Sequence, residues 1–263
     1  MDPIQAIILG FIQGVTEWLP ISSSGHLRFA ELLLELRLPL LFDVTLHLGT
    51  LVVILIFFRK DIKAILSALL RRDFNSENGR LIPLIVTGTI PTALAGLAFS
   101  NAITEYFSGF FPIAAAFLAG GIMLYLSKNG RERSDEITYL ESFAIGIAQG
   151  VALIPGMSRS GLTISIALLL GIKRKKAFKF SFLLSVPAVL GALGLTLIEE
   201  IETLTPIGVD WKDIFLGITV SMIVGYFALK LLWKALAGRK FHLFALYCWL
   251  VGALLVILSL GAF

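Results

Sequence analysis

The amino-acid sequence predicts an all-α integral membrane protein with two inverted-topology repeats, made of six full transmembrane helices and two re-entrant helix hairpins. Composition is the first observation behind this prediction. Of the 263 residues, 57% are hydrophobic and 15% are charged, and the mean hydropathy of +0.90 is typical of proteins embedded in a bilayer. The second observation is a run of polar residues inside apolar sequence. The third is that this run occurs twice.

The two polar runs are GFIQGVTEWLPISSSGHL, starting at Gly10, and GIAQGVALIPGMSRSGLT, starting at Gly146. They match at a fixed offset of 136 residues, with identical pairs Gly10/Gly146, Gln13/Gln149, Gly14/Gly150, Val15/Val151, Ser22/Ser158, Ser24/Ser160 and Gly25/Gly161. Self-similarity at a fixed spacing indicates a repeat architecture. We therefore expect a single membrane domain over 1–263, with repeat 1 at about 1–127 and repeat 2 at about 141–263.

Each repeat contains a hairpin and three spans. A helix needs about 20 apolar residues to cross a hydrocarbon core about 30 Å thick. Six segments meet that length, at about 39–58, 81–99, 110–127, 177–198, 214–234 and 242–262. Four shorter segments lie near 3–19, 24–37, 141–154 and 160–171 and are broken at the turns 20–25 and 155–161, as expected for re-entrant helices.

The first repeat crosses the membrane three times, an odd number. The second repeat therefore enters the membrane from the opposite face. Of the 22 lysines and arginines, eighteen fall in segments 59–80, 128–141, 172–179 and 230–240. Such an excess marks cytoplasmic loops. We expect a multi-pass protein of the cell membrane with both termini outside, whose two hairpins enter from opposite sides and meet near the midplane.

Ionisable residues inside membrane segments are costly and indicate function. Glu17, His26 and Arg159 are such residues. Both turns also end in hydroxyl-rich runs that open a new helix, where unpaired N–H groups attract anions, and an arginine fork can bind two phosphate oxygens. The runs predict a pocket for a multiply charged oxyanion. Helix capping alone, and a structural ion pair between Glu17 and Arg159, are the alternatives.

The spacing within the first run suggests further chemistry. Gln13 and Glu17 are four residues apart and share a helix face. Ser23 and His26 are three apart, which predicts an imidazole beside a hydroxyl that it could activate as a nucleophile; attack by His26 or by water stays open. Asp43 and His47, in the first turns of a span, are interpreted mainly as anchoring or packing residues.

The motifs QGVTEWLPISSSGHL and PGMSRSGLT, with the segment FSFLLSVPA, resemble the undecaprenyl pyrophosphate phosphatase family, also called the bacitracin resistance protein family. The likeness covers nearly the whole chain. It implies a hydrolase that removes the terminal phosphate of a polyprenyl (undecaprenyl) diphosphate and so recycles the lipid carrier for cell-envelope polymer synthesis. It also implies an active site that opens to the outer face of the membrane.

The resemblance assigns roles residue by residue. It extends to Gln13, Glu17, Ser23, His26, Ser158, Arg159, Ser160 and Thr163. Together with the two hydroxyl-rich turns, it predicts catalytic roles for Glu17, Ser23, His26 and Arg159, and substrate binding by Gln13, Ser22, Ser24, Gly25, Ser158, Ser160, Gly161 and Thr163. Gln13 departs from the glutamate that many members carry, which removes one anionic oxygen. The resemblance also implies a divalent cation, Mg²⁺ or another, and we expect it to share Glu17 with the substrate phosphates, without a cage built from protein ligands alone.

A lipid transporter or flippase is the main competing function, because inverted repeats with broken helices at the midplane are common in secondary carriers. A channel is disfavoured, since the polar residues cluster at one site and do not line a path. The expected partners are a polyprenyl diphosphate lipid and the bilayer. The net charge of +4 is dispersed between apolar segments and implies no nucleic acid. A homodimer is left open.

Overall fold

The structure, a computed structural model, describes residues 2–34, 36, 40–107, 109–201 and 210–261. Within these ranges the chain is helical, with no β-strand beyond one isolated bridge between Ser134 and Ile172. The helices are α1 (Pro3–Trp18), α2 (Ser23–Leu33), α3 (Leu40–Phe57), α4 (Arg59–Leu70), α5 (Leu81–Tyr106), α6 (Phe110–Leu126), α7 (Tyr139–Val151), α8 (Arg159–Leu169), α9 (Arg174–Ile201), α10 (Trp211–Ala237) and α11 (Phe244–Leu260). Two short 3-10 turns, Ser127–Asn129 and Phe241–Leu243, complete them.

Five helices of the described chain are long and apolar enough to cross a membrane: α5, α9 and α10, and α6 and α11 when each is taken together with its adjoining 3-10 turn. They correspond to five of the six predicted spans. The sixth prediction, at 39–58, corresponds to α3, whose described apolar part, Thr45–Phe57, belongs to a shorter class. The prediction of a multi-pass, all-helical membrane protein is confirmed.

The four short helices form two hairpins, α1–α2 and α7–α8, broken at the predicted turns. Helix α1 starts with a capping box in which Asp2 and Gln5 satisfy each other's backbone N–H groups, and Thr138 and Glu141 form the same arrangement before α7. Ser158 caps α8 by accepting from the Gly161 N–H. The polar residues at these helix ends therefore set where each hairpin helix begins.

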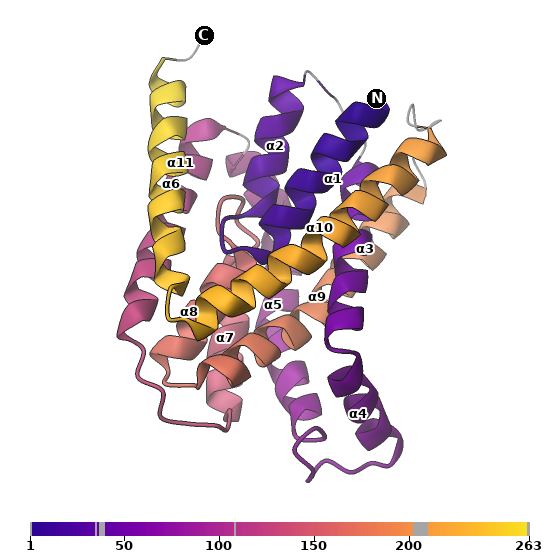
Figure 1. The fold of residues 1–263 in the computed structure, drawn as a ribbon, viewed down its shortest axis with the longest axis vertical. Helices are drawn as coiled ribbons and strands as arrows, with labels where there is room; N and C mark the ends of the chain where they lie inside the picture. Colours follow the sequence, from indigo (N-terminus) through magenta and orange to yellow (C-terminus); the bar gives the residue numbers. More distant parts are fainter. Residues whose placement is uncertain (1, 35, 37–39, 108, 202–209, 262–263) are drawn as a thin grey trace.

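Helices of the first half pack on helices of the second. Helix α1 packs on α10, α7 packs on α5, and α6 packs on α11; Figure 1 shows α1 beside α10. Glycines permit the close approach: a Cβ on Gly10 would overlap the Gly217 carbonyl oxygen, and a Cβ on Gly146 would overlap that of Gly88. Each hairpin thus lies against a long helix of the other half.

The basic segments gather at one end of the molecule. Figure 1 shows α4 at the bottom, away from the start of α1 and the end of α11 at the top. Ion pairs join the segments there: Lys179 to Asp61 at 2.5 Å, Lys176 to Glu77 at 2.5 Å, and Lys173 to Asp135. The segment 59–80 was expected to be a cytoplasmic loop, whereas its first half is α4, in which Ile62 and Ile65 pack against the larger cluster of buried apolar residues.

Candidate functional site

The turns of the two hairpins touch each other. The Gly156 N–H donates to Ser22 Oγ at 3.1 Å, and Ser160 Oγ donates to the Trp18 carbonyl at 3.0 Å. Gly161 packs so closely on Pro20 that an added Cβ would lie 3.3 Å from the Pro20 Cβ. The predicted meeting of the two hairpin tips is therefore found in the structure.

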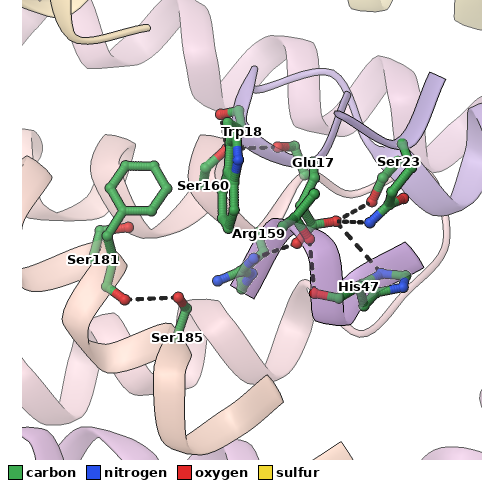
Figure 2. Close-up of polar contacts among 12 residues, drawn as sticks. Glu17, Trp18, Ser23, His47, Arg159, Ser160, Ser181 and Ser185 are labelled. Carbon is green, nitrogen blue, oxygen red and sulfur yellow. Dashed lines mark hydrogen bonds and ion pairs between the residues drawn. The ribbon is translucent and has the colours of Figure 1, made fainter. Parts of the chain in front are cut away.

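Glu17, at the end of α1, joins the two turns. Its carboxylate is buried, with 9% exposure. Oε1 accepts a hydrogen bond from Arg159 Nη2 at 2.5 Å, and Oε2 accepts one from Ser23 Oγ at 2.7 Å. Gln13 Nε2, one turn earlier on α1, also donates to Oε2 at 3.2 Å. Figure 2 shows Ser23 and Arg159 converging on this carboxylate from opposite sides.

An aromatic side chain supports the arginine. Arg159 is the first residue of α8, and its Cζ lies 5.8 Å from the centroid of the Trp18 ring, within cation–π range. Trp18 is 1% exposed and meets Phe182 edge-on at 5.5 Å, so the ring cannot move without disturbing the core. The guanidinium is therefore held beside the carboxylate, while its planar fork offers further N–H donors.

A cavity of about 290 Å³ lies between the two turns and α9. Part of the lining is polar and consists of Glu17, Ser22, Ser23, Ser24, His47, Ser158 and Arg159, with Thr16, Thr92 and Gln149. The rest of the lining is apolar and consists of Ala152, Leu153, Met157, Ala188, Val189, Ala192 and Leu193. A ligand that suits both parts of this lining has an anionic group joined to an apolar chain.

The predicted pairing of Ser23 with His26 is not made. The Ser23 hydroxyl donates to Glu17, while His26 Nδ1 lies 2.7 Å from the Ser22 carbonyl and His26 Nε2 lies 2.7 Å from Tyr247 Oη. The physical reason is that Ser23, at the first position of α2, faces the end of α1, and an ionised carboxylate is a stronger acceptor than an imidazole. His26, one turn later, faces α11.

His47 is a site residue that the sequence analysis interpreted as packing or anchoring. Its Nε2 lies 3.5 Å from Glu17 Oε2, and it lines the cavity (Figure 2). The sequence did contain a signal, because an imidazole in an apolar span is as unusual in lipid as the carboxylate of Glu17. Asp43, considered with it, has a side chain outside the described part of the structure.

The remaining predicted binding residues divide into two groups. Ser22, Ser24 and Ser158 line the cavity with the charged residues, whereas Gln13 is fully buried behind Glu17. The second group packs around the turns and does not line the cavity. Gly25 packs against Phe117, Gly161 packs on Pro20, and Ser160 bonds the Trp18 carbonyl. Thr163 donates to the Arg159 carbonyl at 2.8 Å and lies 2.5 Å from the Ser181 hydroxyl.

The cavity supplies few ligands for a cation. Among the described residues no group of three or more histidine, cysteine, aspartate or glutamate side chains could hold a metal ion. Glu17 is the carboxylate of the lining, and its two oxygens already accept from Arg159 and Ser23. This donor set suits a divalent cation that arrives on phosphate oxygens and shares Glu17 with them.

Comparison with known proteins gives one consistent result. The family described as "Bacitracin resistance protein BacA" matches residues 6–254. A relative from Carboxydothermus hydrogenoformans is 42% identical over 98% of this chain and 98% of its own length. Relatives from Methanobrevibacter smithii and Korarchaeum cryptofilum are 40% and 39% identical over 96% and 99% of this chain and 96% and 100% of their own lengths. All three are named undecaprenyl-diphosphatase.

Proposed function

The chain belongs to the bacitracin resistance protein BacA family, and from this premise we propose that it hydrolyses undecaprenyl diphosphate to undecaprenyl monophosphate and inorganic phosphate. The observation that carries the proposal is one carboxylate, Glu17, holding the Ser23 hydroxyl and the Arg159 guanidinium in the polar part of the cavity lining. The relatives are named for the hydrolase activity, so a transporter is not favoured.

The chemistry follows from the contacts of Ser23. Its Oγ attacks the terminal phosphorus, and its proton passes to Glu17 Oε2, to which it already donates at 2.7 Å. The bond from that phosphorus to the bridging oxygen breaks, and the electron pair leaves with the lipid monophosphate. Glu17 passes the proton to the departing phosphate oxygen and is again a base. Water then attacks the phosphoserine and gives a proton to Glu17, the bond from phosphorus to Ser23 Oγ breaks, and Glu17 returns that proton to Ser23 Oγ as inorganic phosphate leaves.

Charge stabilisation comes from the second hairpin. Arg159, which like Ser23 bonds the Glu17 carboxylate, and the N–H groups at the start of α8 neutralise the phosphoryl oxygens. Gln13 and His47 keep the Glu17 carboxylate in place. His26 is a weaker candidate for the nucleophile or base, because its two ring nitrogens face the Ser22 carbonyl and Tyr247.

We also propose that Mg²⁺ or another divalent cation binds through Glu17 and the substrate phosphates, where it neutralises charge. The site residues alone bind and orient the diphosphate through Arg159 and the helix starts. Addition of a chelator to the purified protein is therefore expected to lower phosphate release, and addition of excess Mg²⁺ to restore it. Unchanged turnover after exhaustive chelation would contradict the metal requirement.

Reciprocal packing supports an inverted arrangement of the two repeats. Helices α5 and α10 match at one offset of 129 residues, through Gly88/Gly217, Thr92/Ser221 and Gly96/Gly225. Each set packs against the hairpin helix of the other repeat.

The basic residues support the orientation of the chain in the membrane. With the basic end cytoplasmic, both termini lie outside and the cavity opens to the outer face. After replacement of Cys248, single cysteines at 71 and 175 should resist an impermeant reagent in intact cells while one at 205 reacts; the reverse pattern would refute this topology.

The direct test of the proposed function is phosphate release by purified protein. Polyprenyl diphosphates of several chain lengths would be supplied in detergent or vesicles, and phosphate would be measured over time. We expect release that depends on enzyme concentration and on the lipid diphosphate. Binding or movement of the lipid across vesicles without phosphate release would instead support a transporter.

A further inference from the structure

His26 is held between two helices from distant parts of the chain. Its Nε2 lies 2.7 Å from the Tyr247 hydroxyl of α11, and the two rings stack with centroids 5.7 Å apart and an interplanar angle of 16°. Phe117 of α6 meets the imidazole edge-on at 5.6 Å. The ring therefore has a single orientation, fixed from outside its own hairpin.

The partners of His26 determine which atom donates and which accepts in each of its two hydrogen bonds. The Ser22 carbonyl can only accept, so His26 Nδ1 carries the hydrogen of the 2.7 Å contact between them. In a neutral imidazole Nε2 is then the acceptor, and the Tyr247 hydroxyl donates to it. Tyr247 thus acts on Ser22 through His26.

Ser22 is the residue of the first turn that most needs such support. Its φ of 68° is in the left-handed region, which L residues other than glycine rarely adopt and which persists only where surrounding contacts over-determine it. His26 holds its carbonyl, and the Gly156 N–H holds its hydroxyl. Cys248, next to Tyr247, donates to the Pro20 carbonyl at 3.4 Å. Helix α11 therefore contacts the first turn at two consecutive residues.

We propose that Tyr247 is a positioning residue for the hydrolase reaction, which keeps Ser23 within hydrogen-bond reach of Glu17 by fixing His26 and the backbone of Ser22. This inference rests on the proposed function, in which Ser23 is the nucleophile. Tyr247 and His26 open onto a separate apolar groove between α1, α10 and α11 and do not line the cavity of Glu17. Tyr247 therefore influences turnover without touching the substrate.

Tyr247→Phe is the sharpest test, because it keeps the stacked ring and removes the hydroxyl. We expect kcat to fall about tenfold and KM to change less than about twofold, since one hydrogen bond behind the nucleophile is lost while the anion-binding groups stay. Tyr125→Phe is the matched control: this tyrosine of α6 packs on Trp249 with ring centroids 5.6 Å apart and should leave kcat unchanged. Wild-type kcat in Tyr247→Phe would overturn the proposal.

A double-mutant cycle distinguishes action through His26 from a general structural effect. In a His26→Ala background, Tyr247→Phe should lower kcat by less than about twofold, because the intermediary is already gone. Independent, additive losses would overturn the proposal.

A second readout does not depend on activity. Hydrogen–deuterium exchange measured by mass spectrometry should show faster exchange of the backbone amides around 20–26 in Tyr247→Phe than in the wild type, with no change in Tyr125→Phe. Equal exchange in all three proteins would overturn the positioning role. A wild-type protein that releases no phosphate would instead overturn the proposed function, while the exchange experiment would still test the role of Tyr247.

Discussion

The two hairpin turns occupy matching positions in the two repeats but carry different chemistry. Where the first repeat has Ser23, the second has Arg159, and where the first has Glu17, the second has Leu153. The first turn thus provides a hydroxyl and a carboxylate, and the second provides a guanidinium. The duplicated hairpin thus forms two complementary halves of one site. The carboxylate of Glu17 and the guanidinium of Arg159 lie in different halves.

The positions that stayed identical perform a different task. Ser22 of the first turn accepts from the Gly156 N–H of the second, and Ser160 of the second donates to the Trp18 carbonyl of the first. Ser22 and Ser160 both belong to identical pairs of the repeat. Matched residues therefore join the turns, and unmatched residues line the cavity with charge. The following experiments test that division, starting with the largest expected effect.

Ser23→Ala removes the unmatched hydroxyl of the first turn. We expect kcat to fall at least about 10³-fold, because the attacking oxygen is lost, while binding of a non-hydrolysable diphosphate lipid is largely retained by Arg159 and the helix starts. Phosphate release and lipid binding would be measured on the same preparation. Ser24→Ala and Ser22→Ala are the neighbouring controls and should be milder. Substantial turnover in Ser23→Ala would move the nucleophile to water or His26.

Arg159→Lys keeps the charge of the second turn and removes the planar fork. We expect turnover to fall about 100-fold, since one ammonium group cannot make the two-point contact with a phosphoryl group. Affinity for the lipid diphosphate should fall as well. Steady-state kinetics at several lipid concentrations would separate the two effects. Near-wild-type turnover would mean that the second turn contributes charge alone.

Leu153→Glu gives the second turn the carboxylate that only the first turn has. Leu153 lines the cavity, so the new charge would repel an anionic substrate, and we expect KM to rise about tenfold. Leu153→Gln has nearly the same shape without the charge and should raise KM much less. The pair of variants would be compared by phosphate release. Equal KM values for both would show that the negative charge is not felt at the substrate position.

Ser160→Ala tests a matched residue and should have the smallest effect on chemistry. Loss of the hydrogen bond to the Trp18 carbonyl is expected to lower stability by about 1 kcal/mol, measured by thermal unfolding in detergent, and to change kcat by less than about tenfold. A loss of turnover as large as that of Ser23→Ala, at unchanged stability, would show that matched serines also take part in the reaction.

The sequence predicted the hairpins, most of the spans and three of the charged or nucleophilic groups that meet. The hairpins and spans depend on local length and hydropathy. Glu17 and Arg159 were identifiable as ionisable residues inside apolar segments. Ser23 was singled out by its spacing from His26, although the structure pairs its hydroxyl with Glu17. Helix α4 was not predicted, because 59–80 was assessed for charge and not for apolar periodicity.

The partners of the two histidines could not be predicted, because both depend on contacts between distant segments. The spacing of His26 and Ser23 on α2 predicted a hydrogen bond between them. His26 Nε2 instead bonds the hydroxyl of Tyr247, which is 221 residues away in the sequence. His47 reaches Glu17 from α3, which no spacing rule connects to α1. Local periodicity indicates which face of a helix a side chain occupies, and only the packing of the whole chain decides what that face meets.

The reciprocal packing of the repeats has a consequence for biosynthesis. Glu17 and Arg159 are separated by 142 residues, so at about 5–20 residues per second the ribosome needs roughly 7 to 30 s to make the counterion after the carboxylate. Helix α10, against which α1 packs, is made later still. An uncompensated carboxylate is costly in lipid. The α1–α2 hairpin is therefore expected to wait at the membrane surface, so that a segment made before its counterion and before α10 enters the bilayer only after them.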